Sequence, residues 1–153
     1  MTINQTTEVL VDGVRSVSLQ GLQERTATGL RKKRILVVDD EASVTRLLKL
    51  NLEQTNQYDV RAQVGSSGAL AVAEGFQPDL ILLDVLMPGM DGGELATLLS
   101  ENPKLKSVPI VFLTALATKT DVRRGAGRIG GLPFLAKPVN VDEVLRCLKQ
   151  YLG

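Results

Sequence analysis

The chain has 153 residues, of which 44% are hydrophobic and 23% are charged, with a formal net charge of +1 at pH 7. This composition is typical of one globular domain. The nearly balanced charge excludes a strongly basic protein that needs bound nucleic acid to neutralise it. Histidine is absent and Cys147 is the single cysteine, which excludes histidine-based catalysis, histidine metal ligands and an intramolecular disulfide.

Residues 1–33 are predicted to form a flexible, polar and basic extension. The segment mixes Thr, Gln, Ser and Gly with scattered Val and Leu, and it leads into the basic run Arg31-Lys32-Lys33-Arg34. This run could meet an acidic partner or nucleic acid, but we favour a solvated junction and expect no direct DNA binding. We find neither a signal peptide pattern nor an apolar run of the roughly 20 residues that span a membrane, so we expect a cytoplasmic protein.

From residue 34 onward, predicted strands and helices alternate. In chain order they are a strand over 35–39, a helix over 44–52, a strand over 58–63, a helix over 66–75, a strand over 80–84, a helix over 92–101, a strand over 109–114, a helix over 119–128, a strand over 133–136 and a helix over 141–148. Five alternating pairs predict an α/β domain with a parallel five-stranded sheet and helices on both faces.

Polar residues end or directly follow four of the predicted strands. Asp39 and Asp40 follow the first strand, Asp84 ends the third, Thr114 ends the fourth, and Lys137 follows the fifth. In an open parallel sheet, ligands bind beyond the carboxyl ends of the strands. We therefore expect three carboxylates, one hydroxyl and one amine to converge at one edge of the sheet.

These residue types predict a site for a divalent cation and a phosphoryl group. Three carboxylates without histidine or a second cysteine offer only oxygen ligands, which suit Mg²⁺ or Mn²⁺ better than zinc. A carboxylate can also act as the nucleophile that accepts a phosphoryl group, and a lysine can pair with a phosphoryl oxygen. A cation would also relieve the repulsion between the adjacent carboxylates of Asp39 and Asp40.

Four motifs together resemble the receiver domain of two-component response regulators. They are ILVVDDE (35–41), LILLDVLMPGMDGGEL (80–95), PIVFLTA (109–115) and FLAKPVNVDEVL (134–145). The resemblance spans residues 34–152 and implies a receiver domain over 34–153, with a doubly wound, flavodoxin-like sheet in the strand order 2-1-3-4-5.

The same resemblance implies roles for the acidic residues. Asp84 would be the phosphoacceptor, which receives its phosphoryl group from a phosphohistidine. Asp40 would bind Mg²⁺ directly and Asp39 mainly through water. Asp84 and the backbone carbonyl of Leu86 would complete the protein ligands, and Mn²⁺ could replace Mg²⁺.

Three further residues would respond to the phosphoryl group. Thr114 and Lys137 would each contact a phosphoryl oxygen, and Thr114 with Phe134 would form the switch between two packings. Leu86 and Leu116 lie two residues after Asp84 and Thr114, and their apolar side chains predict slow entry of water and therefore slow autodephosphorylation.

The resemblance also implies partners. We expect a histidine kinase or a histidine phosphotransfer protein as the donor, and a downstream protein that binds the face formed by the helix over 119–128, the strand over 133–136 and the helix over 141–148. We expect a stand-alone response regulator without a fused output domain, as a monomer or a phosphorylation-dependent dimer. It would be no enzyme beyond its own phosphoryl transfer and autodephosphorylation.

Three alternatives remain open. Phosphatases of the haloacid dehalogenase type use an aspartate nucleophile in a D-x-D pair after the first strand, but here Glu41 stands where the second aspartate should be. A flavin-binding module of the flavodoxin kind needs hydroxyls and glycines after the first strand, whereas this chain offers acids. A receiver-like module that does not accept phosphate normally lacks an acid or the lysine, and neither is missing here.

Overall fold

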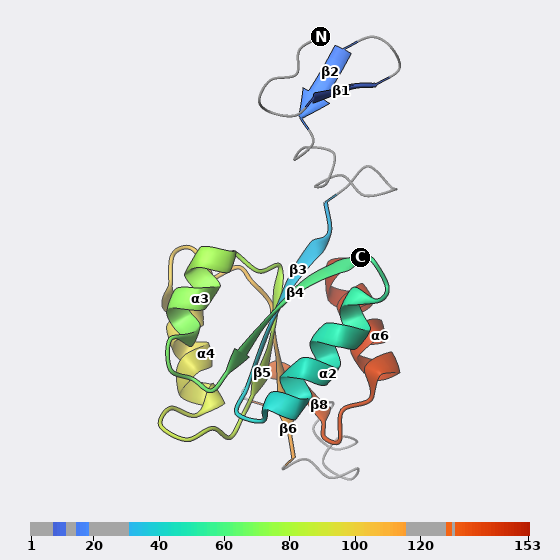
Figure 1. Ribbon diagram of the computed structural model, residues 1–153. Coiled ribbons are helices and arrows are strands. Elements are labelled where there is room, and N and C mark those ends of the chain that lie inside the picture. The colour runs from blue at the N-terminus through green and yellow to red at the C-terminus, as the bar shows by residue number, and fades with distance from the viewer. Residues whose placement is uncertain (1–7, 12–14, 19–30, 116–127, 130) are drawn as a thin grey trace. The chain divides into compact units, whose positions relative to one another are not determined.

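The computed structural model describes residues 8–11, 15–18, 31–115, 128–129 and 131–153, and the chain divides into two compact units, Met1–Lys32 and Lys33–Gly153 (Figure 1). Within the first unit, β1 (Glu8–Val11) and β2 (Arg15–Ser18) pair as an antiparallel two-stranded sheet. Neither strand is predicted from the sequence pattern, and the flexible extension over residues 1–33 stays a prediction.

The second unit is built on a parallel sheet. Its five parallel strands are β3 (Lys33–Asp39), β4 (Tyr58–Val64), β5 (Leu80–Asp84), β6 (Ile110–Thr114) and β8 (Leu132–Ala136). They lie in the order β4-β3-β5-β6-β8, which confirms the predicted order 2-1-3-4-5.

A sixth, two-residue strand corrects one prediction at the edge of this sheet. The predicted helix over 119–128 lies outside the described residues except for Arg128, and Arg128 belongs to β7 (Arg128–Ile129) instead. This strand pairs antiparallel with β8, with Arg128 opposite Pro133. Gly131, at φ 84°, lies in the short connection between the two strands, a backbone conformation that glycine adopts without strain.

Helices cover both faces of the sheet, as predicted (Figure 1). α2 (Ala42–Glu53) and α6 (Val141–Leu152) pack on one face, and α3 (Ala69–Phe76) and α4 (Gly92–Glu101) pack on the other. Successive side chains of a strand point to opposite faces of the sheet, so each strand contributes residues to the hydrophobic core on both faces. In β3, for example, Ile35 and Val37 belong to the core under α2 and α6, and Leu36 and Val38 to the core under α3 and α4.

Two helix ends differ from the predictions by three residues or more. α3 begins at Ala69 and not at residue 66, because Gly65 at φ 83° and Gly68 at φ 77° have left-handed backbone that a helix does not contain. α6 continues to Leu152 because Tyr151 and Leu152 still pack against the core. Among the described residues, no helix combines the length and apolar character that crossing a bilayer requires.

Candidate functional site

The first acidic residues of the site lie where β3 ends and α2 begins. Asp39 is fully buried, and its Oδ1 accepts a hydrogen bond of 2.9 Å from the Glu41 backbone N–H. The Asp39 carbonyl oxygen accepts a further bond of 2.9 Å from Gly65 N–H. Asp40 and Glu41 are exposed, so this turn places one carboxylate inside the protein and two at its surface.

Asp84 lies at the same sheet edge, one strand away. Every residue of β5 is buried, and Asp84, which ends it, is 4% exposed. The backbone after Asp84 is fixed from two sides, since Val85 N–H donates to the Leu113 carbonyl (3.1 Å) and Gly92 N–H donates to the Val85 carbonyl (2.7 Å). The second bond brings the start of α4 against the backbone of Asp84.

Lys137 joins these acids from the turn after β8. Its ammonium lies 2.9 Å from Asp39 Oδ2, 3.0 Å from Glu41 Oε1 and 3.5 Å from Asp84 Oδ1. The Lys137 backbone N–H donates to the Thr114 carbonyl (2.8 Å), and the Lys137-Pro138 peptide bond is cis. The side chain is 11% exposed, so this lysine is a largely buried cation among three carboxylates.

The remaining predicted residues lie close by in the fold. Thr114 ends β6, is buried, and stands in register with Ala136 of β8. Phe134 lies on β8, paired with Phe112 of β6, with its ring in the core under α3 and α4. Leu86 follows β5 and is 54% exposed, whereas Leu116 lies outside the described residues.

The electrostatics of the site follow from burial and crowding. Burial, contact with the Asp40 carboxyl and the negative charge of Asp39 raise the pKa of Asp84 from 3.8 to about 6, and the Lys137 ammonium only partly opposes them. Burial by itself lowers the pKa of Lys137, but the carboxylates of Asp39 and Glu41 outweigh it and hold that pKa above its ordinary value. The site therefore holds a charged lysine beside an aspartate that resists ionisation.

The raised pKa of Asp84 predicts a pH dependence of stability. The folded state binds the Asp84 proton more tightly than the unfolded state, so the contribution of this group to stability is lost as pH rises from 3.8 to about 6. Over this interval we expect the unfolding free energy of the metal-free protein to fall by about 1–3 kcal/mol relative to that of Asp84→Asn. Urea unfolding of both proteins at several pH values measures this difference. If the unfolding free energies of the two proteins changed with pH in parallel, the raised pKa of Asp84 would be contradicted.

The residues present fit a hard divalent cation. Carboxylate oxygens of Asp39, Asp40 and Glu41 all lie within 4.8 Å of one another. Asp39 Oδ2 is buried and, among the described residues, receives no hydrogen bond of good geometry, although Lys137 pairs with it ionically. An oxygen-only donor set that includes a buried carboxylate suits Mg²⁺. Asp84 lies outside this group of three and contacts it through Asp40.

Sequence reasoning missed the role of Glu41. The predicted site contains Asp39 and Asp40 but not the third acid of the same motif, which pairs with Lys137 across 96 positions of the chain. The position of Glu41 directly after two acids was a signal that it belongs to the same edge. Its partner depends on side-chain directions, which the sequence pattern does not specify.

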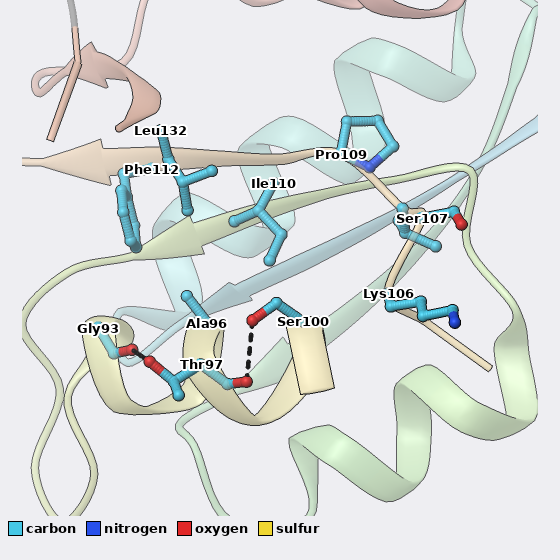
Figure 2. A pocket seen from close by; sticks show the side chains of 11 residues that line it. Gly93, Ala96, Thr97, Ser100, Lys106, Ser107, Pro109, Ile110, Phe112 and Leu132 are labelled. Atoms are coloured by element: carbon cyan, nitrogen blue, oxygen red, sulfur yellow. Dashed lines mark hydrogen bonds between the residues drawn. The ribbon is translucent and has the colours of Figure 1, made fainter. Parts of the chain in front are cut away.

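A separate cavity of about 580 Å³ lies between α4 and the strands β6 and β8 (Figure 2). Its rim includes Thr97 and Ser100, whose hydroxyls donate to the Gly93 and Thr97 carbonyls of the same helix at 3.0 Å each (Figure 2). Its apolar lining comes from Ala96 of α4, Val108 and Pro109 before β6, Ile110 and Phe112 of β6, and Leu132 of β8. None of the predicted site residues lines it, so we do not count it as part of the candidate site.

Comparisons with known proteins point to one family. Residues 35–149 match the family model of the response regulator receiver domain. The chain is 41% identical to the response regulator PleD of Caulobacter vibrioides over 112 residues, which is 73% of this chain but only 24% of PleD, so it spans about a quarter of that relative. It is 31% identical to the polar-differentiation response regulator DivK of Brucella ovis over 122 residues, 79% of this chain and 97% of DivK. Among solved structures, the chemotaxis protein CheY4 of Vibrio cholerae superposes with a TM-score of 0.67 at 30% identity, covering 79% of this chain and 99% of that one.

Proposed function

The chain belongs to the family of response regulator receiver domains, and from this premise we propose that it accepts a phosphoryl group on Asp84 and signals through a changed protein surface. A histidine kinase or a histidine phosphotransfer protein would be the donor, and the cytoplasm would be the compartment. The observation that carries the proposal is the gathering of Asp84, Asp39 and Lys137 at the carboxyl edge of the sheet.

Asp84 is the nucleophile in this proposal. One of its carboxylate oxygens attacks the phosphorus of a phosphohistidine, and a P–O bond forms as the P–N bond breaks. The imidazole leaves with the bonding electron pair and takes up a proton. Such a transfer depends mainly on in-line positioning and on neutralising charge, so the surroundings of Asp84 matter more than any additional acid or base.

The neighbouring residues hold the cation and the transferred group. Mg²⁺ would be held directly by Asp40, Asp84 and the backbone carbonyl of Leu86. Asp39 would hold it mainly through water. The bound ion would neutralise charge on the phosphoryl oxygens. Lys137 would pair with one phosphoryl oxygen and Thr114 would hydrogen-bond another. The oxygen-only cluster at Asp39 to Glu41 and the charged Lys137 support this assignment.

The output would pass from Thr114 to Phe134. Phosphorylation adds nearly two negative charges and three acceptor oxygens, which draw the Thr114 hydroxyl toward Asp84 and free space for the aromatic ring. Phe134 also lines a hollow of about 420 Å³ between β8 and α6, together with Arg146 and Tyr151 of α6. A downstream protein that binds the face formed by residues 119–128, β8 and α6 would sense this change. The chain would act as a messenger, with no catalysis beyond its own phosphoryl transfer and hydrolysis.

Incubation of the full chain with acetyl phosphate tests the proposal. We expect intact-mass spectra to show one added phosphoryl group in the presence of Mg²⁺ and none when EDTA removes the metal. Asp84→Asn should lose the adduct completely, because the amide is no nucleophile. Asp142→Asn, an exposed aspartate in the first turn of α6, removes the same charge and should keep the adduct.

An adduct that persists in Asp84→Asn would place the phosphoacceptor elsewhere. No adduct in the wild-type protein under any condition would leave a receiver fold that acts as an interaction module independent of phosphorylation.

A further inference from the structure

Glu41 makes a contact that the proposed roles of the site do not use. Its Oε1 accepts a hydrogen bond of 3.0 Å from the Lys137 ammonium, the cation assigned above to a phosphoryl oxygen. Glu41 stands directly before α2, and its side chain makes no capping bond to the free N–H groups of the helix. The carboxylate is therefore directed at Lys137 and away from the helix.

The three carboxylate partners of Lys137 are not equivalent. Asp39 is fully buried and Asp84 is the acceptor itself, so neither can turn away from the site. The Glu41 side chain is 57% exposed, and water can replace the lysine at little cost. The positive end of the α2 dipole also favours a carboxylate at this position after it has released the lysine. Glu41 is thus the partner that Lys137 can leave most easily.

Resting on the function proposed above, we propose that Glu41 is a positioning residue that holds the Lys137 ammonium in the unphosphorylated protein and competes with the phosphoryl oxygen for it. When Asp84 carries a phosphoryl group, Lys137 exchanges the Glu41 oxygen for a phosphoryl oxygen, and Glu41 turns to water. The pair between residues 41 and 137 stabilises the resting state and so sets how tightly the site holds a phosphoryl group.

Binding of beryllium trifluoride, a stable mimic of a phosphoryl group, measures this competition. The titration is done by calorimetry on the full chain at saturating Mg²⁺. A change in metal affinity then does not alter the measured Kd for beryllium trifluoride. We expect Glu41→Gln to lower the Kd for beryllium trifluoride by about two- to five-fold, as loss of a half-exposed ion pair implies. Glu101→Gln, an exposed glutamate at the end of α4, should leave the Kd unchanged.

A second pair of variants separates this competition from simple charge repulsion. If Glu41 acts through Lys137, Glu41→Gln should have no effect on the Kd when Lys137 is already methionine. Urea unfolding without metal gives a readout that needs no bound group. There, Glu41→Gln should lower the unfolding midpoint in the wild-type background and leave it unchanged in the Lys137→Met background.

An unchanged or higher Kd for Glu41→Gln would overturn the inference, and so would an equal effect of Glu41→Gln in both backgrounds. These outcomes leave the proposed function intact. If the wild-type protein binds no beryllium trifluoride at all, the proposed function fails, and the inference falls with it.

Discussion

Replacing Gly92 with alanine is expected to destabilise the protein by about 3 kcal/mol, the upper end of the usual cost of overpacking. A Cβ at this position would fall on the Asp84 carbonyl oxygen and within 2.8 Å of Val85 Cα. Both contacts are with backbone, which has no rotamer to change. The start of α4 or the Asp84 backbone must therefore move, so we also expect weaker phosphorylation of Asp84.

Gly75→Ala is the matched control for this variant. Gly75 lies inside α3, and a Cβ there meets nothing within 4 Å. Alanine is a better helix former than glycine, so this variant should gain roughly 0.5–1 kcal/mol. Urea unfolding of the three proteins measures both effects. Equal stability of Gly92→Ala and the wild-type protein would contradict the close approach of α4 to the acceptor residue.

Replacing Lys137 with methionine is expected to have the second large effect on stability. Lys137 is the cation that compensates the fully buried carboxylate of Asp39 and also approaches Asp84. Removing one partner of a buried ion pair leaves the other charge uncompensated and typically costs about 3–5 kcal/mol. We therefore expect about 3 kcal/mol of destabilisation in metal-free protein.

Mg²⁺ should restore part of the stability that Lys137→Met loses. A divalent cation bound by the same acids supplies the missing positive charge, and it stabilises the folded state increasingly as its concentration rises above its Kd. Lys104→Met removes an exposed lysine and should stay within about 0.5 kcal/mol of the wild-type protein. Thermal unfolding of Lys137→Met and Lys104→Met with and without Mg²⁺ measures both effects. A loss in Lys137→Met that Mg²⁺ does not reduce would argue against a cation site at these acids.

The central part of the fold could be predicted because burial leaves few choices. β5 has the predicted bounds, Leu80–Asp84, since the residues before Asp84 form the continuous apolar run that a strand covered on both faces requires. α4 also has its predicted bounds, and Asp91 and Glu94 form a capping box that starts it. At the edge of the sheet, the hydrophobic pattern of the sequence is weaker. The two-residue β7 depends on pairing with β8, and no periodicity indicates so short a strand.

The candidate site divides in the same way. The edge that gathers Asp39, Asp84 and Lys137 could be predicted, because parallel strands end together and each of these residues ends or follows a strand. The contact of Glu41 with Lys137 could not, since it depends on the rotamers of two long side chains at a turn. The contact of Asp40 with Asp84 depends on side-chain direction as well.

Locating the phosphoryl group on the chain is the decisive test of Asp84 as the phosphoacceptor. Full-length protein treated with acetyl phosphate and Mg²⁺ is reduced with borohydride, which converts an aspartyl phosphate into homoserine, and its peptides are sequenced by tandem mass spectrometry. We expect homoserine at position 84 and aspartate at positions 39 and 40. Homoserine at either of those two positions, or unmodified aspartate at all three, would contradict it.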